Sequence, residues 1–220
     1  MTSTEAFIQA RNLLMAQRKD HERACAKFQW PQLENFNWAL DWFDAYAKNN
    51  NRPALRVVSR DAGEIKLSFR ELSERSNQVA NFLRGQGVRR GDPILLMVSN
   101  VVAFWEVMLA TIKLGAVVIP ATTMLTREDL LDRIERGGVR HVVTGAGDAP
   151  KFMDIPGDYT RVAIGSAPAG WQRFDEAYRA SPIYSPHGPT PADAPLLLYF
   201  TSGTTAKPKL VEHTHVSYPV

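Results

Sequence analysis

Residues 92–120 read DPILLMVSNVVAFWEVMLATIKLGAVVIP, and this stretch decides the fold class. ILLMVS, residues 94–99, is a nearly uninterrupted apolar run, typical of a strand buried on both faces of a parallel sheet. Asn100 is placed to cap a helix whose apolar side chains cover most of its circumference, and Gly115 ends that helix. AVVI, residues 116–119, is a second apolar strand. The stretch therefore predicts a strand–helix–strand unit with parallel strands.

The residues before this unit predict a hairpin followed by a helix. LRVVSR, residues 55–60, and EIKLSF, residues 64–69, are strand-like and flank a turn at residues 61–63. Ser68 and Glu71 stand three residues apart, the spacing of a capping box, and apolar residues then recur on one helical face.

The alternation of helices and strands continues after the unit. Thr126 opens a helix that ends near Gly137, and HVVT, residues 141–144, follows as a strand. RVAIG, residues 161–165, is a further strand, and WQRFDEAYR, residues 171–179, predicts a short helix. The sequence thus predicts an α/β fold with a mostly parallel sheet flanked by helices.

Two regions differ from this alternation. Residues 1–50 are helix-rich and aromatic, and we expect the aromatic rings to form core packing rather than a base-stacking platform. Residues 51–220 carry the α/β pattern. Within them, SPIYSPHGPTPADAP, residues 181–195, holds five prolines and predicts an extended surface connection that need not be a domain boundary.

Composition excludes several classes of protein. Hydrophobic residues at 45% and charged residues at 22% describe an ordinary folded protein, not a disordered or fibrous one. The net charge of +3, from 26 basic and 23 acidic residues, is too small to require a nucleic-acid or anionic-membrane partner. Residues 101–121 are apolar, but Glu106 and Lys113 interrupt them, so they predict core rather than a membrane span.

Cysteine content and the amino-terminal sequence predict the location. Cys25 is the single cysteine, so no internal disulfide forms and no oxidising compartment is needed. Residues 1–20 mix charged and apolar side chains without the apolar core of a secretory signal. We therefore expect a cytoplasmic protein.

The most informative chemistry follows the predicted strand LLLYFT, residues 196–201. Four hydroxyl side chains, a glycine and two lysines gather within nine residues: Thr201, Ser202, Gly203, Thr204, Thr205, Ala206, Lys207, Pro208 and Lys209. Such groups supply the hydrogen-bond donors and positive charge that a polyphosphate needs, and ligands of α/β proteins bind beyond the carboxyl ends of strands. The alternative is a polar turn with solvated lysines. The sequence contains neither GxxxxGK[ST] nor GxGxxG, so the better-known phosphate loops do not apply.

YFTSGTTAKPK, residues 199–209, closely resembles the phosphate-binding signature of the AMP-forming adenylating superfamily, which includes acyl-CoA synthetases, luciferases and peptide-synthetase adenylation domains. Residues 67–100 and 104–126 resemble two earlier blocks of that family, in the same order. FNWALDWFD, residues 36–44, and KLVEHTH, residues 209–215, resemble its medium-chain and aromatic acyl-CoA synthetase branch. The resemblance covers nearly the whole chain.

The resemblance implies a two-step ligase reaction. A carboxylic acid attacks the α-phosphorus of Mg-ATP to give acyl-adenylate and pyrophosphate, and the thiol of coenzyme A then displaces AMP. The loop of residues 201–209 would bind the ATP phosphates, which makes its contribution positional and electrostatic. No residue in the chain is predicted to be a catalytic nucleophile or a metal ligand. Ala206 and Leu210 stand where the family commonly has glycine, which affects the loop's conformation but removes no donor side chain.

The length implies a partial enzyme. Members of the family are well over twice as long, and their adenine-binding, metal-binding and acyl-pocket motifs lie beyond the loop, as does the small C-terminal domain with its catalytic lysine. We therefore expect an N-terminal fragment, the first part of the large N-terminal domain, that is inactive alone and that can self-associate through exposed apolar surface. The alternative is a non-catalytic nucleotide-binding or interaction module that keeps this fold.

Single residues and small clusters suggest weaker candidates. His213 and His215 would share one face of a strand and could bind a metal if further ligands joined them, but structural histidines are favoured. Cys25 has no evident activating neighbour beyond Arg23 and Lys27. Two charged groups are predicted to be a solvated helix face and a solvated turn rather than an acid–base pair and an anion site: Asp129, Asp132 and Glu135; and Arg84, Arg89 and Arg90.

Overall fold

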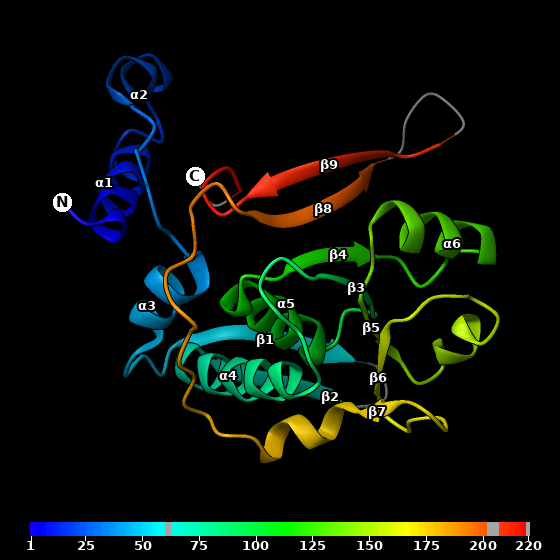
Figure 1. Ribbon diagram of the computed structural model, residues 1–220. Helices are drawn as coiled ribbons and strands as arrows, with labels where there is room; N and C mark the ends of the chain where they lie inside the picture. Colours follow the sequence, from blue (N-terminus) through cyan, green and yellow to red (C-terminus); the bar gives the residue numbers. More distant parts are fainter. Residues whose placement is uncertain (60–62, 202–206, 219–220) are drawn as a thin grey trace.

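A seven-stranded sheet forms the centre of the computed structural model, which describes residues 1–59, 63–201 and 207–218 (Figure 1). Its strand order is β7-β6-β5-β3-β4-β8-β9. The strands are β3 (Pro93–Met97), β4 (Val117–Ala121), β5 (His141–Gly145), β6 (Thr160–Ile164), β7 (Gln172–Arg173), β8 (Pro195–Thr201) and β9 (Lys209–Thr214). All neighbouring pairs are parallel except β8 with β9. The mostly parallel α/β sheet expected from the sequence is confirmed.

Helices cover both faces of this sheet. α4 (Phe69–Gly85) and α5 (Val102–Leu114) pack on one face, and α6 (Arg127–Arg136) packs on the other, together with the 3-10 turn η2 (Ala149–Phe152). Successive side chains of β3 alternate between the two layers: Leu96 contacts the α4–α5 layer, whereas Leu95 contacts the α6 layer. This alternation explains why the strand is apolar throughout.

The first 50 residues are helical and aromatic, as the sequence predicts. They form α1 (Ser3–Ala16), α2 (His21–Lys27), the π-helical turn η1 (Trp38–Asp44) and α3 (Ala45–Ala47). The rings of Trp38 and Trp42 stack with centroids 5.2 Å apart, and Phe36 and Phe43 are buried. Trp30 and Tyr46 are exceptions, because 62% and 39% of their surfaces are exposed. The predicted hairpin follows as β1 (Pro53–Ser59) and β2 (Gly63–Ser68), an antiparallel pair.

Side-chain caps explain where α4 and α6 begin, whereas the predicted cap of α5 is wrong. The Ser68 hydroxyl accepts a hydrogen bond from the Glu71 amide at the start of α4, as predicted, and Thr126 accepts one from Asp129 at the start of α6. Asn100 does not cap α5. Val101 occupies the N-cap position, and the Asn100 side-chain oxygen instead accepts a hydrogen bond from the Trp105 indole at 3.4 Å.

The region before β8 differs in part from expectation. Residues 172–173 pair with β6 as β7, so the predicted short helix is limited to the 3-10 helix η3 (Phe174–Arg179). Residues 181–194 then run as the predicted extended connection, which we call the strap. Side chains of α4 hold it: Asn81 Nδ2 donates to the carbonyls of Ser181 and Ile183, each at 2.8 Å.

Candidate functional site

The predicted phosphate loop follows the carboxyl end of β8. β3, β4 and β8 run parallel, so their carboxyl ends at Met97, Ala121 and Thr201 lie at one edge of the sheet. α5 follows β3 onto one face and α6 follows β4 onto the opposite face, which creates a topological switch point between these two strands. Ligands of open α/β sheets bind at such a point, and β8 is the next strand beside it.

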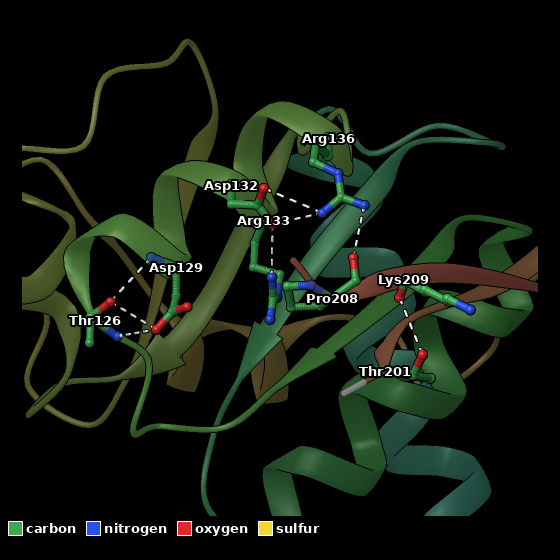
Figure 2. A network of polar contacts seen from close by, with 8 residues as sticks. All are labelled: Thr126, Asp129, Asp132, Arg133, Arg136, Thr201, Pro208 and Lys209. Atoms are coloured by element: carbon green, nitrogen blue, oxygen red, sulfur yellow. Dashed lines mark hydrogen bonds and ion pairs between the residues drawn. The ribbon is translucent and has the colours of Figure 1, made fainter. Parts of the chain in front are cut away.

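Four of the nine predicted phosphate-binding residues are described: Thr201, Lys207, Pro208 and Lys209. Ser202, Gly203, Thr204, Thr205 and Ala206 lie outside the described residues. Thr201 is paired with Lys209 across the antiparallel ladder, and the Thr201 hydroxyl donates to the Lys209 carbonyl at 3.5 Å (Figure 2). The ladder therefore fixes both ends of the loop at the edge of the sheet.

α6 anchors the far side of this loop. Arg136 Nη2 donates to the Pro208 carbonyl at 3.0 Å, and its Nη1 lies 3.0 Å from the Asp132 carboxylate (Figure 2). Arg133 pairs with the same carboxylate at 2.9 Å, and its guanidinium lies 4.1 Å from the centroid of the Phe200 ring. Asp132 was expected on a solvated face. It is instead the centre of an ion-pair network that the sequence did not connect to the loop.

The electrostatics of the described loop residues suit an anion. Lys207 and Lys209 are exposed, and the described residues give neither an acidic partner. Asp132, on the neighbouring helix, is already paired with Arg133 and Arg136. Ammonium groups without an acidic partner are donors that a polyphosphate can use. The two described lysines are therefore chemically compatible with an anionic ligand.

The two histidines of the next strand are not brought together as a metal site. His213 lies on β9 against Tyr199, with ring centroids 6.1 Å apart, whereas His215 lies beyond the end of that strand. His215 is fully buried, and burial lowers its pKa to about 4, with a further contribution from Arg90. Among the described ranges there is no group of three His, Cys, Asp or Glu side chains that could hold a metal.

The other candidates have structural roles. Asp129 completes the capping box of α6 with Thr126. The hydrogen bond from the Thr126 backbone amide is the main cause that lowers the pKa of the Asp129 carboxyl group, and the bond from the Thr126 hydroxyl adds to it. Arg84 and Arg90 are not merely solvated, because each donates to strap carbonyls. Cys25 is exposed, with its sulfur 3.4 Å from His21 Nε2. Within the described chain, no helix is long and apolar enough to cross a membrane.

Comparison with known proteins identifies the family of the chain. The AMP-binding enzyme family matches residues 42–218. The chain is 34% identical to the human mitochondrial acyl-coenzyme A synthetase ACSM5 over 197 residues, which is 84% of this chain and 34% of that protein. It is 30% identical to mouse mitochondrial ACSM4 over 210 residues, 90% of this chain and 36% of the relative. The chain thus spans about a third of the length of these curated relatives.

Solved structures share the fold. The acyl-CoA synthetase of Brucella canis matches with a TM-score of 0.80 at 24% identity, over 89% of this chain and 38% of that one. The N-terminal domain of FACL13 from Mycobacterium tuberculosis matches with a TM-score of 0.67 at 27% identity, over 83% and 45% of the two chains. The sheet and its helices are therefore those of the first part of such N-terminal domains.

Proposed function

The chain belongs to the AMP-binding enzyme family, and from this premise we propose that it supplies the ATP phosphate-binding loop of an AMP-forming acyl-CoA synthetase, an acid–thiol ligase. Its curated relatives named above are acyl-coenzyme A synthetases. The observation that carries the proposal is the position of Thr201 and Lys209, which join across the ladder at the carboxyl edge of β8. β8 is the strand next to the switch point between β3 and β4, and ligands of open α/β sheets bind near such points.

In this proposal the loop acts on the leaving group. Thr201, Ser202, Gly203, Thr204, Thr205 and Lys209 hold the β- and γ-phosphates of ATP, while Ala206, Lys207 and Pro208 complete the turn. Lysine charge offsets the negative charge that develops on the departing pyrophosphate, and the hydroxyls orient it. Arg136 supports the turn through the Pro208 carbonyl and touches no phosphate.

The co-substrates follow from the proposed reaction. ATP, accompanied by Mg²⁺, and a carboxylic acid yield acyl-adenylate and pyrophosphate, and coenzyme A takes the acyl group in the second step. The likeness of residues 36–44 and 209–215 to one branch of the family favours a medium-chain or aromatic acid. Residues 1–50 are then a helical, aromatic-rich first segment, and residues 51–220 are an incomplete α/β portion of the adenylating domain.

ATP–pyrophosphate exchange tests the proposal on the 220-residue chain. Because the adenine, metal and acyl motifs of the family lie beyond the part that this chain matches, we expect no exchange with a panel of medium-chain and aromatic acids. Exchange above background would contradict the proposal that the chain is inactive alone, and the acid that supports exchange would be identified as a substrate. ATP binding without exchange supports the proposal.

The second candidate function is a non-catalytic nucleotide-binding or interaction module that keeps the fold. Failure of the chain to bind ATP at all would count against both the ligase and a nucleotide-binding module, and would leave an interaction module. Light scattering separately tests whether apolar surface drives the chain to self-associate. We retain the cytoplasm as the proposed location, whereas the curated relatives are named mitochondrial, and cell fractionation distinguishes the two compartments.

A further inference from the structure

A basic pocket of about 580 Å³ lies at the amino edge of the sheet, the edge opposite the phosphate loop. It is formed by the end of α4, the turn that leads into β3, the end of α5, and the strap. Its polar walls come from six residues: Arg84, Arg89, Arg90, Lys113, Tyr184 and His187. This basic pocket is no part of the proposed ATP site, because its lining residues precede β3, β4 and β8, whereas the loop follows the carboxyl end of β8.

None of the three arginine guanidinium groups of the basic pocket forms an ion pair with a described acidic side chain, although the Asp92 carboxylate, which pairs with Arg140, accepts a hydrogen bond from the Arg89 backbone amide at 2.7 Å. Arg84 Nη1 donates to the Ser185 carbonyl at 2.9 Å, and Arg90 Nη2 donates to the Gly188 carbonyl at 3.0 Å. Arg89 Nη1 likewise reaches only carbonyl oxygens among the described groups. Each guanidinium has five donors, so several stay available for a ligand.

The neighbouring lysine does not compete for the same ligand. Lys113 Nζ lies 2.7 Å from the Asp44 carboxylate and donates to Asn77 at 2.6 Å. Its ammonium group is therefore engaged on the α4 side. The carboxylate of Asp44 serves Lys113 and not the arginines.

The arginines are held in position by the fold. Gly115 has φ 68°, and a Cβ there would lie 3.2 Å from Arg90 Cγ, so the absence of a side chain makes room for the Arg90 stem. The Arg84 guanidinium lies 5.0 Å from the centroid of the Tyr184 ring. Side chains that are already ordered lose little conformational freedom when a ligand binds.

From these observations we propose that the basic pocket binds a small polyanion of the phosphate type. Guanidinium groups match phosphate oxygens with paired hydrogen bonds, and three of them converge on one concave surface. The volume of about 580 Å³ lies within the range of small-molecule sites. The site is additional to the ATP loop and adds a second phosphate-binding position to the chain.

Calorimetric titration of inorganic pyrophosphate tests this proposal in the Lys209→Ala background, which removes the lysine assigned to the ATP loop. We expect binding to persist there, and to weaken at least fivefold on adding Arg89→Gln or Arg90→Gln. Arg23→Gln is the charge-matched control, because Arg23 is an exposed arginine on α2, and it should leave the affinity unchanged. Thermal unfolding confirms that each variant is folded.

Two results would overturn the proposal: no pyrophosphate binding in the Lys209→Ala chain, or an affinity that neither arginine variant changes. Arg90→Gln could weaken binding indirectly by loosening the strap. The affinity of the Arg89→Gln variant then tests the proposal, since the described contacts of the Arg89 guanidinium include no strap residue. Binding that Lys209→Ala abolishes in the otherwise native chain supports the ATP loop and refutes the basic pocket. The two proposals can therefore fail separately.

Discussion

At the scale of single residues, the core contains a buried acidic side chain, the carboxyl group of Glu106. Its side chain is fully buried on α5, where it accepts a hydrogen bond from the Tyr178 hydroxyl at 2.7 Å and lies 3.5 Å from Arg75 Nη1. Burial raises the pKa of Glu106 above its ordinary value of 4.5, against the opposing effects of Tyr178 and Arg75. Ionisation of this group therefore costs stability in the folded state.

Glu106→Gln should be about as stable as the native chain at pH 7.5, or more stable, within about 1 kcal/mol, because glutamine removes a charge that is costly to bury and the Arg75 side chain stays 42% exposed to water. The direction in which the free energy of unfolding changes with pH follows from the raised pKa of Glu106. Below pH 4.5 the carboxyl group is protonated in both states, and as the pH rises through the folded pKa the native chain loses stability relative to Gln. Urea unfolding at several pH values measures this difference, and a native chain that gains stability over Gln with rising pH would refute it.

At the scale of elements, side-chain caps set where helices begin. Ser68→Ala and Thr126→Ala should each lower the free energy of unfolding by about 1 kcal/mol, because each hydroxyl satisfies a free amide of the first turn. Asn100→Ala should change it by less than about 0.5 kcal/mol, since Asn100 makes no cap. Urea midpoints compare the three variants. An Asn100→Ala cost equal to that of Ser68→Ala would mean that Asn100 caps α5 in solution.

The strap is the second element whose position depends on side chains. Asn81→Ala removes two of the hydrogen bonds that α4 makes to the strap, at a cost of about 1–2 kcal/mol, whereas those from Asn77 to Pro182 and from Arg84 to Ser185 remain. Limited proteolysis followed by mass spectrometry should then detect faster cleavage within residues 181–194. Glu74→Ala is the matched control, because Glu74 lies on α4 and pairs only with Arg70 in the described structure. Equal cleavage of the two variants would show that the Asn81 side chain does not hold the strap.

Local elements were predictable from the sequence, whereas their long-range contacts were not. Strand and helix identities follow from short apolar patterns, and the Ser68 cap follows from a three-residue spacing. The pairing of β8 beside β4, and the contact of Arg136 with the Pro208 carbonyl 72 residues away, depend on tertiary packing that no local pattern encodes. The local sequence of residues 201–209 was enough to predict a phosphate loop. The support of this loop by α6 is a long-range contact, so the sequence did not predict it.

At the scale of the whole molecule, the sheet separates two sites of positive charge. The loop after β8 lies at the carboxyl edge, and the basic pocket lies at the amino edge, before β3. Interactions between exposed charges separated by more than a Debye length are largely screened by salt. Substitutions at one edge should therefore leave anion binding at the other unchanged, which is the basis for testing each site alone.

The central claim is that the loop after β8 binds the phosphates of ATP, and calorimetric titration of Mg-ATP into the Arg89→Gln/Arg90→Gln chain tests it without the basic pocket. Lys209→Ala in that background should weaken binding about tenfold, roughly the 1.4 kcal/mol expected of one charge-assisted contact. Lys27→Ala removes an exposed lysine on α2 and should have no effect. Affinities that are equal in the Lys209→Ala and Lys27→Ala chains, or no ATP binding in the parent chain, would contradict the claim.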